Sequence, residues 1–133
     1  MIQRILVAID DSGLSRRGVK AAIDLACATG AALVALHVVP RYPTAFFEGG
    51  TGRGADDIAR IERRWAEQGR AVVDSVAREA EAAGISVRAA VAQSDSVAEA
   101  ILAAVRKHRC DLVVMASHGR RGLKRMLLGS QTQ

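Results

Sequence analysis

The sequence predicts an α/β fold in which helices cover both faces of an open parallel sheet. Three observations predict this class. Short apolar runs alternate with amphipathic segments, half of the 133 residues are hydrophobic, and only 3% are aromatic. Small aliphatic side chains must therefore build the core, as in helices packed on a sheet. A chain of this length is expected to form one domain, so residues 1–133 are taken as a single domain.

The first half of the chain supplies two buried strands and one helix. Residues 5–9 form a short unbroken apolar run, which is typical of a strand covered on both faces. Asp11 or Ser12 is positioned to cap a helix that Gly30 ends. Residues 32–39, ALVALHVV, predict a second buried strand. The inward positions of the helix are predicted at Val19, Ile23, Ala26 and Cys27.

A loop and a long helix follow. Residues 40–56 hold both prolines of the chain and four glycines without any period, which predicts a loop. The near-match GGTGRGA inside it follows no strand, so these glycines are assigned to flexibility rather than to a dinucleotide site. Residues 56–83 keep one apolar face over the whole segment, and Gly69 within it predicts a bend in a long helix.

The next elements restore the alternation of strand and helix. Residues 85–93 alternate apolar and polar side chains, which predicts a strand with one face in water, at the edge of the sheet. Ser94 or Asp95 is expected to cap a third helix. Residues 111–116, DLVVMA, predict another buried strand.

This alternation predicts right-handed crossovers and a parallel sheet. The continuous strands belong in the centre and the alternating strand outside, which gives the order 3-2-1-4. In that order the chain reverses its direction of travel between the first and fourth strands. The turns after these strands, residues 10–13 and 117–129, then open on one crevice, where open α/β sheets bind ligands.

The stretch ASHGRRGLKRMLLGS, residues 116–130, holds three glycines and five basic residues, one of them histidine. Gly119 and Gly122 allow main-chain amides to approach an anion closely. Residues 123–128 resemble the start of a helix; alternatively, a helix begins at Ser130 and its free amides form a phosphate seat. A glycine-rich turn with an ordinary cap is the other interpretation. The phosphate seat would consist of Gly129, Ser130, Gln131 and Thr132.

The net charge, the cysteines and the histidines indicate which partners and which cell compartment to expect. The formal net charge of +5 favours anionic partners without separating nucleotides from nucleic acids. Cys27 and Cys110 are expected as buried, reduced thiols of a cytoplasmic protein. No leader-like segment opens the chain, and no apolar run approaches the roughly 20 residues that span a bilayer. His37 is expected as a satisfied interior group, His108 as a complement to a helix dipole, and His118 as a hydrogen-bonding loop residue.

Residues 116–130 resemble the nucleotide motif of the universal stress protein family, G-x-x-G-x9-G-[S/T]. Gly119 is followed by nine residues and then by Gly129 and Ser130, whereas Ala116 replaces the first glycine. ILVAIDDS and ALHVV are similar to the family's first strand with its acidic turn and to the end of its second strand. The resemblance covers the whole chain in element order and spacing. It implies a Rossmann-like, adenine nucleotide α-hydrolase-like fold with the order 3-2-1-4-5.

The resemblance further implies a stress-response protein that binds ATP, or else ADP or AMP, as a regulatory module and forms a homodimer. Asp10 would meet the adenine or ribose, and Val38 would offer main-chain hydrogen bonds to adenine. The glycine motif would hold the phosphates, with Mg²⁺ or Mn²⁺ on the phosphate oxygens. The implied nucleotide-binding residues are Ala8, Ile9, Asp10, Ser12, Val38, Ala116, Gly119, Gly129, Ser130, Gln131 and Thr132, with Arg120 and Arg121 neutralising phosphate charge.

Other functions stay open at this point. A slow ATP hydrolase or adenylyl-transferring enzyme would use Asp10 or Asp11 to position metal or water. A stress protein without nucleotide would act through an unknown protein partner. A phosphate-accepting receiver domain would need Asp95 as its acceptor. Nucleic acid is not expected as a partner, because the basic residues lack interleaved aromatic residues.

The end of the sequence raises a separate expectation. In the resembling family a fourth helix and a fifth strand follow the fourth strand, and that fifth strand commonly pairs across a dimer. Because the chain ends at Gln133, we expect these two elements to be missing and the domain to be C-terminally incomplete. The outer edge of the fourth strand would then be uncovered.

Overall fold

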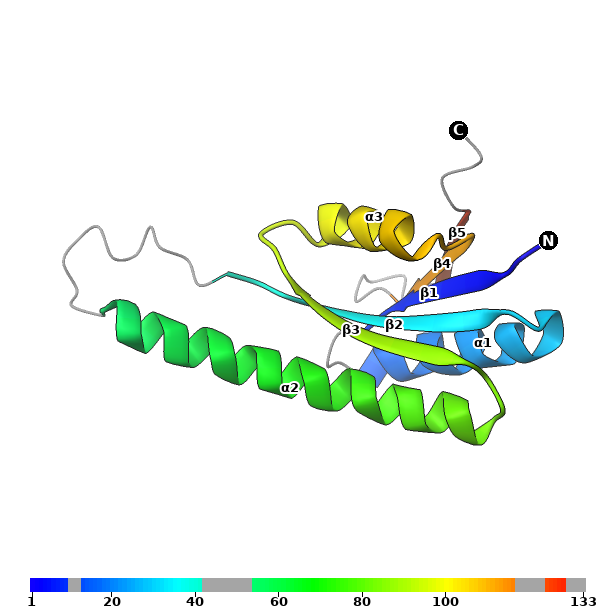
Figure 1. Cartoon of the computed structure of the whole chain (residues 1–133), viewed down its shortest axis with the longest axis horizontal. Helices are drawn as coiled ribbons and strands as arrows, with labels where there is room; N and C mark the ends of the chain where they lie inside the picture. Colours follow the sequence, from blue (N-terminus) through cyan, green and yellow to red (C-terminus); the bar gives the residue numbers. More distant parts are fainter. Residues whose placement is uncertain (10–12, 42–53, 117–123, 129–133) are drawn as a thin grey trace.

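The computed structural model describes residues 1–9, 13–41, 54–116 and 124–128, and these form a single sheet flanked by helices (Figure 1). All predicted strands and helices before residue 117 occur, with small differences at their ends. The elements are β1 (Arg4–Ala8), α1 (Gly13–Thr29), β2 (Ala32–Val39), α2 (Ala55–Ala82), β3 (Val87–Gln93), α3 (Val97–His108), β4 (Leu112–Ala116) and β5 (Lys124–Leu128).

The strand order is β3-β2-β1-β4-β5. β1 pairs in parallel with β2 on one side and with β4 on the other, and β2 pairs in parallel with β3. The predicted parallel order 3-2-1-4 is therefore confirmed, and β3 lies at the edge as its alternating pattern predicts.

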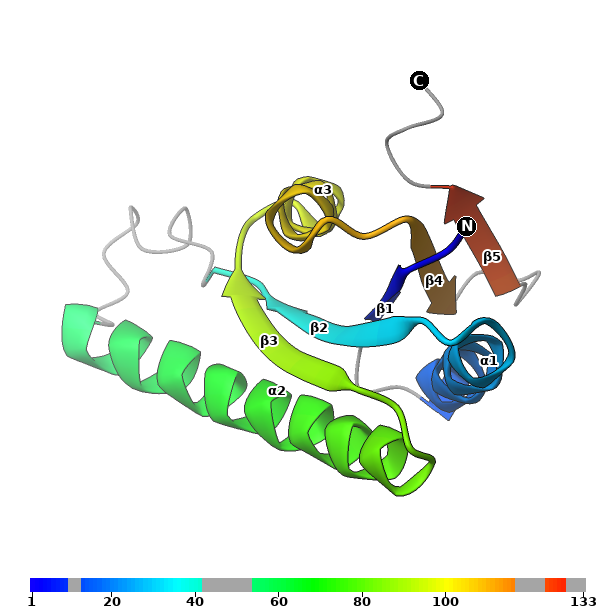
Figure 2. The same ribbon diagram turned by 45° about the vertical axis from the view of Figure 1, so that its right-hand side comes forward.

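Helices cover both faces of the sheet, with α1 and α2 on one face and α3 on the other (Figure 2). Successive strand residues point to opposite faces. Ile5 and Val7 of β1 accordingly pack with the α1 and α2 side chains, whereas Leu6 packs with Ile101 and Val105 of α3. The unbroken apolar runs of the central strands follow from this double burial.

The carboxyl-terminal part of the chain corrects one prediction. One interpretation of the sequence placed residues 123–128 at the start of a helix, and a fifth strand was expected to be missing. Residues 124–128 instead form a strand, β5, which pairs antiparallel with β4 from Leu112↔Leu128 to Ala116↔Lys124. The free backbone groups on the outer side of β4 give a short segment hydrogen-bond partners that an isolated turn of helix does not supply. The edge of β4 that was expected to be uncovered is therefore paired.

The start of α3 corrects a second prediction. Ser96, and neither Ser94 nor Asp95, is the N-cap, because its hydroxyl accepts a hydrogen bond from the Glu99 amide at 3.2 Å. The Ser94 hydroxyl instead donates to the Ser96 carbonyl at 3.0 Å and accepts from the Ser96 amide at 3.1 Å. Ser94 thus orders the turn before the cap. The predicted cap of α1 at Asp11 or Ser12 and residues 42–53 of the predicted loop lie outside the described residues.

The two cysteines differ, which corrects a third prediction. Cys110 is buried as expected, but Cys27 is exposed. The buried stripe of α1 is centred on Ala22 and Ala26, and a helix turns about 100° per residue, so Cys27 falls at the margin of that stripe. Burial also raises the pKa of the Cys110 thiol to about 11, with a smaller rise from Asp111 and an opposing effect of Arg4.

Within the part of the chain that the structure describes, no helix combines the length and the apolar character that a membrane crossing needs.

Alkylation of the folded protein tests the placement of the cysteines. Iodoacetamide at about pH 8 should modify Cys27 and spare Cys110, because Cys110 is buried and a rise from 9.0 to about 11 lowers its thiolate fraction about a hundredfold. Peptide mass spectrometry after brief labelling measures both sites. In denaturant the two thiols should react alike, and equal labelling of the folded protein would contradict the placement.

Candidate functional site

The carboxyl ends of β1 and β4 lie side by side, at the point where the chain changes its direction across the sheet. From β1 the chain crosses through α1 to β2 on one side, and from β3 it crosses back through α3 to β4 on the other. Ala8, the last residue of β1, is paired with Leu36 of β2 and with Met115 of β4. In an open α/β sheet such a reversal leaves a crevice between the turns that follow the two strands.

The backbone of Ile9, directly after β1, is held by β2 through both of its polar groups. Its amide donates to the Leu36 carbonyl at 2.8 Å, and its carbonyl lies 2.8 Å from Nδ1 of His37. A carbonyl oxygen only accepts hydrogen bonds, so Nδ1 of His37 carries the proton. The chain therefore leaves β1 from an anchored position, directly before the acidic residues 10 and 11 of the sequence.

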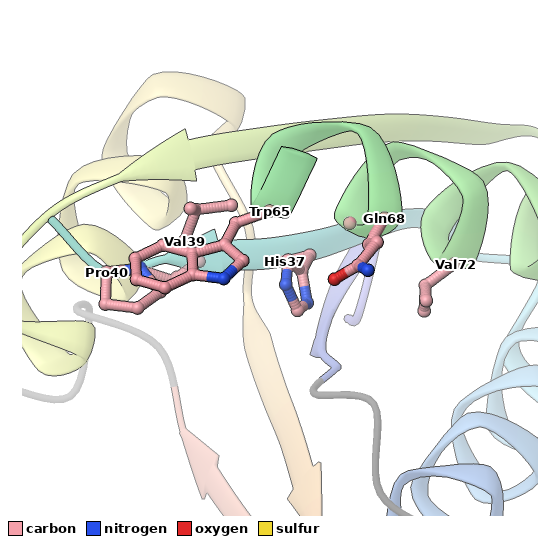
Figure 3. A pocket seen from close by; sticks show the side chains of 8 residues that line it. His37, Val39, Pro40, Trp65, Gln68 and Val72 are labelled. Carbon is pink, nitrogen blue, oxygen red and sulfur yellow. The ribbon is translucent and has the colours of Figure 1, made fainter. Parts of the chain in front are cut away.

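His37 also lines a pocket of about 270 Å³ between the end of β2 and α2 (Figure 3). In Figure 3 the imidazole stands between Trp65 and Gln68, which come from one face of α2. This half-buried, hydrogen-bonded position confirms the prediction that His37 is a satisfied interior group. The pocket is lined by His37, Val38, Val39, Pro40, Trp65, Gln68, Gly69 and Val72.

Gly69 has a packing role in the structure. It is buried in the middle of α2, and a Cβ atom at this position would overlap the imidazole of His37. α2 runs without interruption from Ala55 to Ala82, and at Gly69 the helix approaches the imidazole closely. Glycine is disfavoured inside a helix by about 1 kcal/mol relative to alanine, and here it makes room for the side chain that holds Ile9.

Four of the residues expected to bind nucleotide can be placed. Ala8 ends β1, Ile9 follows it directly and Ala116 ends β4, so the structure brings these three to the same edge of the sheet. Val38 lies near the end of β2, on the other side of β1 from β4. The other expected residues lie outside the described residues: Asp10, Ser12, Gly119, Arg120, Arg121, Gly129, Ser130, Gln131 and Thr132.

Hydrogen-bond alternation shows which way the Val38 backbone faces. In a parallel strand, residues two apart direct their main-chain groups to the same neighbour. Ala32 donates to Gln3 and the Leu36 carbonyl accepts from Ile9, both on the β1 side, whereas the Val39 carbonyl accepts from Ser94 on the β3 side. The amide and carbonyl of Val38 therefore face the β1 side. They lie two residues beyond Leu36, the last residue of β2 that pairs with β1.

The sheet order argues against the receiver domain. Asp95 follows β3, and β2 separates β3 from β1, so Asp95 is not brought beside the acidic turn after β1. Its carboxylate is exposed and lies 3.9 Å from Arg41. Among the described residues, no group of three His, Cys, Asp or Glu side chains is arranged to hold a metal ion.

Sequence reasoning missed the roles of Gln68 and Gly69 beside His37 and treated Trp65 only as part of an apolar helix face. A glycine four residues after a tryptophan in an otherwise strong helix was the available signal, because four residues bring both to one face.

A double-mutant cycle tests the contact between Gly69 and His37. In the wild-type background Gly69→Ala should lower the free energy of unfolding by about 1 kcal/mol, because overpacking outweighs the gain in helix propensity. In a His37→Ala background the same change should raise it by up to about 1 kcal/mol, because only the propensity gain remains. Urea denaturation of the four proteins gives these values, and an equal effect in both backgrounds would refute the contact.

Comparison with known proteins supports the assignment of a family. A universal stress protein of Methanocaldococcus jannaschii is 29% identical over 130 residues, which are 98% of this chain and 73% of that relative. A universal stress protein family structure from Burkholderia pseudomallei has 28% identity and a TM-score of 0.73, over 88% of this chain and 83% of that one. A family structure from Arabidopsis thaliana with AMP bound has 15% identity and a TM-score of 0.64, over 89% and 78% of the two chains.

The model of the universal stress protein family matches residues 1–133. The match spans the whole sequence, and the observed parallel order 3-2-1-4 agrees with the order that the resemblance implied. The chain therefore belongs to the universal stress protein family.

Proposed function

We propose that this protein binds an adenine nucleotide at the carboxyl edge of the sheet and acts as a cytoplasmic stress-response regulatory module. The observation that carries the proposal is the parallel pairing of β1 with β4. This pairing puts the carboxyl ends of β1 and β4 side by side. In the sequence, β1 is followed by the acidic residues 10 and 11, and β4 is followed by the segment 117–130 with its Gly119-x9-Gly129-Ser130 spacing. The Arabidopsis relative with AMP bound supports an adenine nucleotide as the ligand class.

The adenine end of the ligand is proposed to lie beside Ile9 and Val38. The Ile9 backbone is fully engaged with β2, whereas the amide and carbonyl of Val38 face the space beyond Ile9. One donor and one acceptor on a fixed strand suit the edge of a purine ring. Ala8 and Ile9 contribute apolar surface at the end of β1, and Asp10 follows them directly to meet the ribose or adenine.

The phosphates are proposed to lie against residues that follow β4. Ala116 ends that strand where the family motif has its first glycine. The proposed phosphate ligands are Gly119, Gly129, Ser130, Gln131 and Thr132, with Arg120 and Arg121 neutralising charge and Ser12 contributing from the β1 side. Mg²⁺ or Mn²⁺ would be carried on the phosphate oxygens, as the family resemblance implies.

Nucleotide titration of variants tests this assignment. ATP should bind the wild-type protein, and Ser130→Ala should weaken binding about tenfold or more because a hydrogen bond to a charged phosphate is lost. Gly119→Val should weaken it further by blocking close approach of the backbone. Isothermal calorimetry measures the affinities, and Trp65, the only tryptophan, provides a fluorescence signal near Val38.

Matched controls keep this test specific. Ser75→Ala removes an exposed hydroxyl from α2, and Gly54→Val adds a side chain where a Cβ atom would have nothing within 4 Å. Both variants should bind ATP like the wild type. A wild-type protein that shows no saturable binding of ATP, ADP or AMP would contradict the proposal.

We also propose a homodimer, with the outer side of β5 as the pairing edge. β5 is the last strand of the described sheet on that side, and an edge strand offers unpaired backbone groups to another chain. Sedimentation equilibrium should report twice the chain mass of 14.1 kDa, and Leu127→Pro should shift the protein toward a monomer by removing a backbone donor from the outer side of β5. A wild-type protein that stays monomeric at high concentration would contradict the dimer.

A further inference from the structure

A second pocket, of about 320 Å³, lies at the amino edge of the sheet, away from the proposed nucleotide site. Its walls come from the first residues of β1, β2 and β3 and from the last turn of α3. Four basic side chains face it from three of these elements: Arg4 from β1, Arg88 from β3, and Lys107 and His108 from α3. Ser86 adds a hydroxyl, and Ala32, Leu33, Val34 and Val87 complete the lining.

Arg4 is held in place from both ends. Its guanidinium nitrogen Nη1 donates to the His108 carbonyl at 2.7 Å, and its backbone amide donates to Oδ2 of Asp111 at 3.0 Å. The same Asp111 oxygen accepts from the Gln3 amide at 2.6 Å, and Asp111 does not line the pocket. One guanidinium nitrogen of Arg4 thus donates to a carbonyl at the end of α3, and this bond fixes the guanidinium group beside the cavity.

The positive charge of the pocket is not offset by acidic side chains. Among the residues that the structure describes, neither Arg88 nor Lys107 pairs with a carboxylate, and no Asp or Glu lines the cavity. The pKa of His108 is lowered, first by burial and then by the charges of Lys107, Arg88 and Arg4. The positive charges of Lys107, Arg88 and Arg4 therefore all disfavour the charged form of the His108 imidazole.

A structural role for the basic residues explains only part of this arrangement. Basic side chains near the end of α3 complement the helix dipole, and Arg106, Lys107 and His108 supply them from its last turn. Arg88 belongs to the edge strand β3 and is not needed for that purpose. Arg88 is exposed on this edge strand, as the alternating pattern predicts, and it lines the same cavity as Lys107 and His108.

We propose that this pocket binds a small phosphate-bearing anion. Its volume is at the lower end of small-molecule sites, which suits one or a few phosphate groups. Arg4 and Arg88 present guanidinium groups, which form paired hydrogen bonds to phosphate oxygens, and Lys107 adds a point charge. The pocket is separate from the proposed nucleotide site, because Arg4 begins β1 and Ala8 ends it, four residues or about 13 Å away.

Anion binding in this pocket is coupled to a proton. An imidazole is the side chain that changes its charge near neutral pH, and His108 supplies the imidazole in this pocket. A bound anion stabilises the imidazolium and raises the lowered pKa of His108. The complex then takes up a proton on binding, and affinity increases as the pH falls from about 8 to about 6.

Calorimetry with sodium tripolyphosphate and with sulfate tests the proposal. Sulfate keeps its charge over this pH range, so any change of the sulfate affinity with pH reports on the protein alone. Saturable binding is expected with both anions, more tightly at about pH 6 than at about pH 8. NMR of the His108 ring protons should show a pKa that rises on addition of sulfate, and His108→Gln should remove the pH dependence.

Charge-matched variants locate the anion. Arg88→Gln and Lys107→Gln should each weaken tripolyphosphate binding about tenfold or more. Arg63→Gln is the control, since it removes the same charge from an exposed position on α2 that does not line the pocket. Far-ultraviolet circular dichroism and urea unfolding of each variant establish that the fold is retained.

Three results would overturn the proposal. The first is no saturable binding of either anion, and the second is an equal loss in Arg63→Gln and Arg88→Gln. The third is tripolyphosphate binding that Gly119→Val abolishes and Arg88→Gln leaves unchanged, which would place the anion at the other edge. ATP affinity measured in Arg88→Gln should equal that of the wild type, so failure of the nucleotide site and of this pocket are distinguished.

Discussion

Parallel pairing of β1 on both of its sides is the constraint on which the rest of the structure depends. With β2 on one side and β4 on the other, the crossovers that leave β1 and arrive at β4 run in opposite directions. Such a reversal opens a crevice at the carboxyl edge, which follows from topology and does not depend on any one side chain. Double burial of β1 in turn requires apolar residues on both faces, and Ile5, Leu6 and Val7 meet that requirement.

Both ends of β1 are also fixed by polar contacts to neighbouring elements. At the carboxyl end, the Ile9 backbone bonds to Leu36 and His37, and Gly69 leaves space for that imidazole. At the amino end, Asp111 accepts from the Arg4 amide, and the Arg4 side chain reaches the end of α3. The proposed nucleotide site and the basic pocket therefore occupy opposite ends of one anchored strand.

Much of the fold could be predicted because the burial of a strand or helix face requires apolar residues at regular spacing in the sequence. Continuous apolar runs marked the central strands, and alternation in residues 85–93 placed β3 at the edge. Choices between adjacent residues could not be made in this way: Ser94 and Ser96 are both good caps, and only the hydrogen bond to Glu99 separates them. β5 depends on a pairing partner that local sequence does not show, and the role of Gly69 depends on a side chain from a distant strand. For the proposed nucleotide site, the motif could be recognised in the sequence, whereas the direction in which the Val38 main-chain groups point required the hydrogen-bond pattern of β2.

Amide chemical shifts during an ATP titration test the central claim most directly, because they report on the position of the ligand without any substitution. The account predicts that the largest changes in a ¹⁵N-labelled protein occur at Ile9, Val38 and Ala116, at the carboxyl ends of three neighbouring strands. Ser86 and Arg88, at the opposite edge, should change little at ATP concentrations that saturate the first group. Shift changes concentrated at the amino edge, with Ile9 and Val38 unaffected, would contradict it.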